Sequence, residues 1–118
     1  MSVGAAIRIT SPDEERVIKH AAEFAQQQGS HCYVISIVHE LPYGDIVKRN
    51  LELIAQLKAT PVIQEGDEIA KTLLIVAQSF GIRMLFLQSG PAHGLGRTIA
   101  EQLLYLDPPF DVVVVGSE

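Results

Sequence analysis

The sequence has a single cysteine and few basic residues, and each shortage excludes a class of protein. Cys32 alone cannot build an internal disulfide framework. Nine Lys and Arg residues against fourteen Asp and Glu residues give a net charge of −5. The basic residues are scattered, which disfavours binding to nucleic acid or to an anionic membrane. The first ten residues lack the layout of a signal peptide, and their apolar run is too short to span a bilayer. We therefore expect a soluble, cytoplasmic protein with no nucleic-acid partner and no membrane insertion.

What the sequence does contain is an alternation of short apolar runs and amphipathic stretches. At 118 residues and 47% hydrophobic content, it is long and apolar enough for one domain with its own core. No repeat, low-complexity tract or linker interrupts it, so we expect a single domain over residues 1–118. Five short runs rich in β-branched or bulky residues predict buried strands. They lie at 5–10, 32–39, 60–64, 83–88 and 111–116.

Four stretches between these runs have the apolar spacing of helices. The first is expected to begin after Ser11, with Pro12 in its first turn and Glu14 completing a Ser-x-x-Glu capping box, and to end at Gly29. The other three are expected at about 43–58, 67–80 and 96–106. The residues predicted to face inward are Val17, Ala21, Phe24 and Ala25, then Val47, Leu51 and Ile54, then Ile69, Leu73, Val76 and Phe80, and finally Ile99, Leu103 and Leu106. Gly81 is the expected terminator of the third helix.

Strands that alternate with helices predict an α/β sandwich around a mostly parallel sheet, most simply a doubly wound one. In such sheets, ligands bind beyond the carboxyl ends of the strands, at the topological switch point. The predicted strand ends are Thr10-Ser11, Val38-His39-Glu40 and the stretch that follows Leu87. We expect Ser11 and the stretch after Leu87 to face each other if the first and fourth strands are neighbours.

That last stretch, LQSGPAHGLGRT at residues 87–98, has two interpretations. It is a ligand loop if the backbone N–H groups at the start of the fourth helix bind an anion, with Arg97 pairing to a phosphate and Thr98 donating its hydroxyl. It is a flexible bend if its glycines only supply turn conformations. It matches neither the dinucleotide fingerprint nor the Walker A loop. The residues predicted to contact a ligand at this edge are Thr10, Ser11, Val38, Gly90, Gly94, Gly96, Arg97 and Thr98.

The other polar residues predict no catalytic or metal site. His31 and Cys32 are adjacent in a strand, so their side chains point to opposite faces and cannot share a metal. His39 and His93 lie on the expected ligand edge, whereas His20 is expected to be partly exposed beside the first helix. Three acidic residues fall in first helical turns, where the helix dipole accounts for them: Glu14, Asp67 and Glu68. No nucleophile, base and orienting group come together in the pattern.

Taken in order, these segments resemble a universal stress protein, and most closely the stress-protein-type domain of Kdp potassium-sensing histidine kinases. The resemblance lies in IRITSPDEERVIKHAAEFAQQQGSHCYVISI, in EGDEIAKTLLIVAQSFGIRMLFLQSG and in GRTIAEQLL…FDVVVV, which together span nearly the whole chain. It implies an adenine-nucleotide alpha-hydrolase-like sandwich with a five-stranded parallel sheet of order 3-2-1-4-5. It also implies homodimers formed through the last strand, here Asp111, Val112, Val113, Val114 and Val115, and a sensor-kinase or transporter domain as a partner.

The resemblance further implies ATP or another adenine nucleotide as ligand, although two features depart from the ATP-binding pattern. Family members commonly end the first strand with an acidic residue, where this sequence has Thr10. Their loop after the fourth strand reads Gly-x-x-Gly, nine residues, then Gly-Ser or Gly-Thr. Here Gly90, Gly94 and Gly96 lie much closer together, and Arg97 precedes Thr98. This loop is several residues too short to wrap a triphosphate in that manner, which leaves a smaller anion or another nucleotide. The serine-containing motif of members that bind cyclic di-adenosine monophosphate is not matched.

Three functions follow from these observations. The first is a non-catalytic regulatory domain that acts through dimerisation and partner contacts, with ligand binding optional. The second is a nucleotide-binding stress protein that binds ATP or AMP. The third is a weak ATPase, which would require turnover that is lost in Arg97→Ala. We expect the first, and no enzyme activity.

Overall fold

The computed structural model describes residues 2–88 and 98–116, which form five strands and four helices. The elements follow the order β1 (Ser2–Ala6), α1 (Glu15–Gln28), β2 (His31–Val38), α2 (Asp45–Gln56), β3 (Thr60–Glu65), α3 (Ile69–Ser79), β4 (Ile82–Gln88), α4 (Ile99–Tyr105) and β5 (Asp111–Val115). Among the described residues, no helix combines the length and apolar character needed to cross a membrane.

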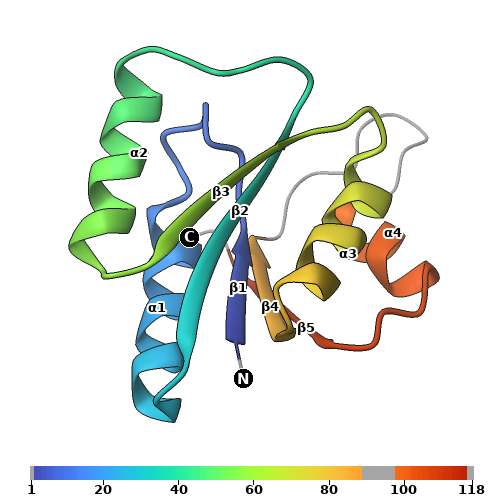
Figure 1. The fold of residues 1–118 in the computed structure, drawn as a ribbon. Helices are drawn as coiled ribbons and strands as arrows, with labels where there is room; N and C mark the ends of the chain where they lie inside the picture. The colour runs from blue at the N-terminus through green and yellow to red at the C-terminus, as the bar shows by residue number, and fades with distance from the viewer. Residues whose placement is uncertain (1, 89–97, 117–118) are drawn as a thin grey trace.

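The five strands form one sheet of order β3-β2-β1-β4-β5, and every neighbouring pair is parallel. Helices α1 and α2 cover one face of the sheet, and α3 and α4 cover the other (Figure 1). The predicted doubly wound α/β fold and its strand order are therefore confirmed. Because β1 pairs with both β2 and β4, the chain reverses its direction of strand addition at β1, and the switch point lies between β1 and β4.

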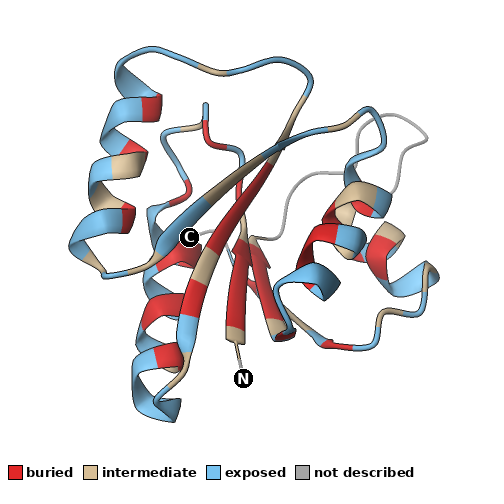
Figure 2. Cartoon of the chain, in the orientation of Figure 1, coloured by how far each residue is buried: buried red, intermediate tan, exposed pale blue. Residues whose placement is uncertain are grey.

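Two apolar cores lie one on each side of the sheet, and the strands contribute buried residues alternately to one core and to the other. In β2, Cys32 and Val34 pack toward α1 and α2, whereas Ile35 packs toward α3 and α4. In β4, Phe86 faces the first pair of helices and Leu87 the second. Figure 2 shows buried positions along the central strands and on the helix surfaces that face them. Both faces of the sheet are covered, as parallel sheets require.

Most of the predicted helix faces are correct, and two residues at helix ends are not. Ile69 and Phe80 are 40% and 38% exposed, although both were predicted to point inward. Ile69 is the first residue of α3 and Phe80 is its C-cap, so both lie where the helix reaches the margin of the sheet. Phe80 instead packs against Tyr33, with ring centroids 4.7 Å apart. The predicted terminators are correct: Gly29 and Gly81 have left-handed backbones with φ of 64° and 66°.

The first strand and the start of the first helix differ from the prediction. The strand was placed at 5–10, but β1 ends at Ala6, and the chain turns where the amide of Ser11 donates to the carbonyl of Arg8 at 2.9 Å. Ile7 and Ile9 are buried in the loop under α1 and α2, so their apolar pattern continues past the strand itself. The β1–α1 loop, residues 7–14, is therefore the long segment at the carboxyl end of β1.

The predicted capping box is also wrong. Helix α1 begins at Glu15 with Glu14 at its N-cap, and the Glu14 side chain makes no capping hydrogen bond. The Ser11 hydroxyl accepts a hydrogen bond from the amide of Asp13 at 3.3 Å, two residues along, which is a local turn contact. The Glu14 carboxylate is engaged elsewhere, with Arg8.

Candidate ligand-binding edge

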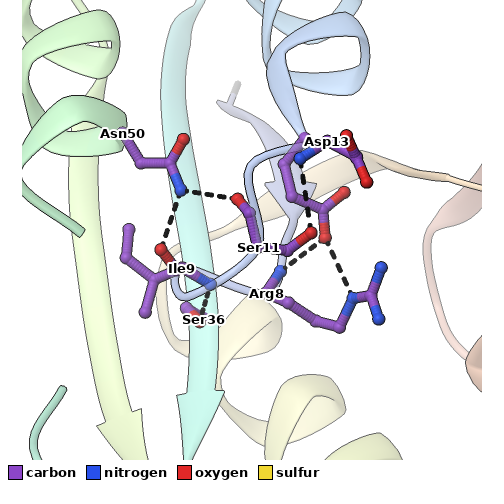
Figure 3. Close-up of polar contacts among 7 residues, drawn as sticks. Arg8, Ile9, Ser11, Asp13, Ser36 and Asn50 are labelled. Carbon is purple, nitrogen blue, oxygen red and sulfur yellow. Dashed lines mark hydrogen bonds and ion pairs between the residues drawn. The ribbon is translucent and has the colours of Figure 1, made fainter. Parts of the chain in front are cut away.

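The β1–α1 loop is held at the carboxyl end of the sheet by polar side chains from two other elements (Figure 3). The Ser36 hydroxyl, on β2, accepts from the amide of Ile9 at 3.1 Å. The Asn50 side-chain amide, on α2, donates to the carbonyls of Ile9 at 2.7 Å and Ser11 at 2.9 Å. Ser36 and Asn50 are only 2% and 6% exposed. They satisfy loop backbone groups that would otherwise be buried without partners.

Sequence reasoning missed both of these residues, although each carries a recognisable signal. Asn50 follows Val47 by three residues and precedes Ile54 by four, which places a polar amide on the apolar face of α2. Ser36 interrupts an otherwise apolar buried strand. A polar residue at an inward position needs a hydrogen-bond partner, and here the partner is the backbone of a distant loop.

A buried carboxylate joins the same loop to the end of β4. Glu14 is 3% exposed, and its Oε1 accepts from the backbone N–H of Arg8 at 2.8 Å and from the Arg8 Nε–H at 3.3 Å. With the amide nitrogen of Gln88 turned toward its acceptors, that nitrogen donates to Glu14 Oε2 at 2.9 Å and to the carbonyl of Asp13 at 2.7 Å. Glu14 therefore is not the residue of the first helical turn that was predicted, but the N-cap of α1 with its carboxylate bound by the loop and by β4. It lies across the switch point between β1 and β4.

The predicted ligand contacts come together only in part. Thr10 is exposed in a turn and does not end the strand, and Ser11 is half-buried with its carbonyl bound by Asn50. Val38 ends β2, and its carbonyl accepts from the amide of Gly66 at 2.9 Å. Thr98 is the N-cap of α4, where its hydroxyl oxygen accepts from the amide of Glu101 at 3.2 Å. Gly90, Gly94, Gly96 and Arg97 lie outside the described residues, as does His93.

The remaining polar candidates have local partners. His39 lies 3.7 Å from Asp67, and both side chains are exposed. Asp67 and Glu68 precede α3 and do not belong to its first turn. The His31 ring nitrogen Nε2 lies 2.7 Å from the Thr60 hydroxyl. Across residues 2–88 and 98–116, no three His, Cys, Asp or Glu side chains gather as metal ligands would.

Cys32 and His31 do point to opposite faces, as predicted. Cys32 is buried and His31 is exposed. Burial raises the pKa of the Cys32 thiol from 9.0 to about 11, which favours the neutral, unreactive form.

A groove of about 300 Å³ lies beside the β1–α1 loop, between the start of α1 and the surface of α2. Its lining residues are Pro12, Glu15, Ile46, Arg49, Asn50, Glu52, Leu53 and Gln56. Of the predicted ligand contacts that the structure describes, none lines it. The groove and the expected ligand edge are therefore neighbouring but separate features.

Comparison with known proteins gives matches in structure but not in sequence. No protein-family model matches the sequence, and no curated protein matches it. A solved universal stress protein in complex with cAMP has a TM-score of 0.79 at 12% identity, over 100% of this chain and 98% of that one. The fold is that of the universal stress proteins. A universal stress protein from Archaeoglobus fulgidus in complex with dAMP gives 0.69 at 18% identity, over 97% and 96% of the two chains. A member of the family from Burkholderia pseudomallei gives 0.69 at 15% identity, over 97% and 94%.

The resemblance to universal stress proteins predicted from sequence is thus confirmed at the level of the fold. The closer resemblance to the Kdp sensor-kinase domain stays a prediction. In the universal stress protein fold of this chain, Glu14 and Gln88 meet where β1 and β4 diverge, and Ser36 and Asn50 hold the loop beside them.

Proposed function

We propose that this chain is a non-catalytic regulatory domain that binds an adenine nucleotide, or a smaller phosphate-bearing ligand, at the carboxyl edge of its sheet. The observation that carries the proposal is the end-to-end match to a universal stress protein in complex with cAMP. A second match, in complex with dAMP, covers 97% of this chain and 96% of that one. The switch point between β1 and β4 is the place where an open α/β sheet binds its ligand.

A binding role is favoured over catalysis by what the polar side chains at this edge do. Ser36, Asn50 and Glu14 each bond to backbone of the β1–α1 loop, so in this structure they hold the loop in shape. A catalytic serine or carboxylate would instead be expected beside a base or in a solvent-accessible cleft. A weak ATPase is the alternative, and it requires turnover that is abolished by Arg97→Ala.

A ligand screen tests the proposal directly. The thermal midpoint is measured with ATP, ADP, AMP, cAMP and cyclic di-adenosine monophosphate, and calorimetry follows any that raise it. A ligand that binds only the folded state raises the free energy of unfolding by about 2.7 kcal/mol at a hundred times its Kd. We expect a monophosphate to stabilise more than ATP because the loop at 87–98 is short. No response to any of the five would contradict nucleotide binding, and phosphate release from ATP would contradict the non-catalytic assignment.

We further propose that the domain acts as a homodimer paired through β5, with a sensor-kinase or transporter domain as the partner it regulates. β5 is an edge of the sheet, and four of its five residues are valine, from Val112 to Val115. Val114 is 48% exposed. The opposite edge, β3, contains Pro61 and ends in Glu65, which are features that discourage strand pairing. The contrast supports β5 as the edge for pairing.

A further inference from the structure

Three donors bind the buried carboxylate of Glu14, and none of them lies in helix α1. They are the backbone N–H of Arg8, the Nε–H of Arg8 and the side-chain amide of Gln88, and we call them the three-donor cluster. Two come from the β1–α1 loop and one from the last residue of β4, so they converge from both strands at the switch point. Their acceptor is the chain's own negative charge.

We propose that Glu14 is an internal occupant of the ligand edge, and that an anionic oxygen of the ligand must replace its carboxylate on the three-donor cluster. This inference rests on the proposed function, and it names the regulation of that same site. The contact is autoinhibitory: the native chain binds a phosphate-bearing ligand more weakly than it would without the Glu14 charge.

The chemistry of the donors supports the exchange. A phosphate oxygen and a carboxylate oxygen are interchangeable acceptors for a guanidinium, a backbone amide and a side-chain amide. The Arg8 side chain is 72% exposed, whereas that of Glu14 is 4% exposed, so the guanidinium reaches solvent while the carboxylate does not. An incoming anion would thus meet Arg8 first and then compete with Glu14 for the remaining donors.

The charge of Glu14 opposes a ligand in two ways. Its charge-assisted hydrogen bonds occupy the donors, and such bonds are roughly twice as strong as neutral ones. Its negative charge also repels a phosphate placed nearby. Glu14→Gln keeps the length and shape of the side chain, keeps an oxygen for Arg8 and removes the charge. It weakens both effects at once.

Glu15→Gln is the matched control. It removes the same charge from the next residue, whose side chain is 60% exposed and pairs with Lys19 on the outside of α1. The native protein and both variants are titrated with AMP by calorimetry, and their thermal midpoints are measured against inorganic phosphate. Circular dichroism and urea denaturation establish that each variant is folded.

We expect Glu14→Gln to bind AMP about tenfold more tightly than the native protein and to gain a larger phosphate-induced rise in its midpoint. Glu15→Gln should stay within about twofold of the native affinity. Equal or weaker binding by Glu14→Gln, with native binding intact, would overturn the inference and leave the proposed function standing. If no form binds AMP, AMP is excluded as the ligand, and phosphate decides the inference alone: stabilisation specific to Glu14→Gln supports it, and its absence overturns it. The proposed function fails only if the native protein responds to none of the five nucleotides and not to phosphate.

A second measurement avoids dependence on the variant. In the native protein, NMR signals of the Arg8 Nε–H and the Gln88 side-chain amide are followed as phosphate is added. A saturable shift of both signals supports exchange at the three-donor cluster. Signals that stay fixed up to tens of millimolar phosphate overturn it, even if Glu14→Gln cannot be prepared in folded form.

Discussion

At the scale of single residues, the shape of the ligand edge depends on a few polar side chains that are buried in apolar surroundings. Ser36 and Asn50 each occupy a position where a hydrophobic residue would ordinarily pack, and each bonds to the backbone of the β1–α1 loop. A neutral hydrogen bond contributes only about 1 kcal/mol in net terms, but leaving a buried partner unpaired costs about 1–3 kcal/mol. The stability of the protein should therefore fall most when one of these side chains is removed and its backbone partner stays buried and unpaired.

Asn50→Ala should lower the free energy of unfolding by about 2–3 kcal/mol, because the carbonyls of Ile9 and Ser11 both lose a donor. Asn50→Asp should cost more, since a carboxylate would face two carbonyl oxygens. Urea denaturation measures both. Gln56→Ala, at an exposed position on the same helix, is the control and should change stability by less than about 0.5 kcal/mol. An Asn50→Ala variant as stable as Gln56→Ala would contradict the role given to this amide.

Cys32 should make stability depend on pH in the alkaline range. Its pKa is raised by burial to about 11, above the 9.0 of an exposed thiol, so the folded state favours the neutral form. This contribution is complete below pH 9 and is lost as the pH rises toward 11, because the unfolded thiol ionises first. The difference in unfolding free energy between the native protein and Cys32→Ala should therefore shrink over that window. A free-energy difference that stays constant over this pH window would contradict the predicted pH dependence.

The same shift predicts slow alkylation of Cys32 in the folded protein. A pKa raised from 9.0 to about 11 lowers the thiolate fraction at pH 8 by roughly a hundredfold. The rate at which iodoacetamide alkylates Cys32 should rise by at least roughly a hundredfold when urea unfolds the protein. Rapid labelling of the folded chain would show that the thiol is accessible.

The burial of single apolar residues could be predicted from the sequence, whereas the burial of single polar residues could not. Apolar residues at helical or strand spacing, such as Val17, Leu73 and Leu103, are buried as predicted, because burial follows from periodicity alone. Glu14 and Asn50 were not recognised, because the partner that makes burial of a polar group tolerable lies in another part of the chain. Asn50 bonds to a residue 41 positions away, and no local pattern contains that information.

At the scale of elements, boundaries were less predictable than the elements themselves. All five strands and four helices were expected, but the first strand lies at Ser2–Ala6 and not at 5–10, because Ile7 and Ile9 are buried by a loop and not by a sheet ladder. The capping box fitted the sequence at Ser11, yet the helix begins four residues later. An apolar pattern reports burial, and it does not distinguish strand from buried loop.

The β3–α3 connection shows how closely two elements approach. A Cβ added at Gly66 would lie 2.5 Å from Thr72 Oγ1 and 2.8 Å from Thr72 Cγ2. Gly66→Ala should therefore lower the unfolding free energy by about 1–3 kcal/mol, as overpacking does. The same change in a Thr72→Ala background should cost less, because both clashing atoms are gone. Gly116→Ala meets nothing within 4 Å and is the control. Equal costs with and without Thr72 would show that the clash is not the cause.

At the scale of the whole molecule, the two sheet edges differ in a way that bears on assembly. Val114→Lys places a charge on the exposed apolar face of β5, where a paired strand of a second copy would cover it. We expect the native protein to be a dimer by light scattering at tens of micromolar, and Val114→Lys to be a monomer. Ile75→Lys, at a 63% exposed apolar position on α3, should remain dimeric. Unchanged mass in Val114→Lys would contradict pairing through this edge.

The attachments of the β1–α1 loop also bear on how the chain folds in time. The loop lies near the N-terminus, but it is held by Ser36 on β2, Asn50 on α2 and Gln88 on β4. This loop is synthesised before each of the elements that hold it, so it cannot take its final shape until Gln88 has been made and β4 has joined the sheet. Because closing long loops costs entropy before such contacts form, we expect these contacts to be weakly developed in the transition state. Variants at Ser36 and Asn50 should accordingly speed unfolding and leave the refolding rate nearly unchanged. The expected ligand edge would then be the last part of the domain to form and the first to open.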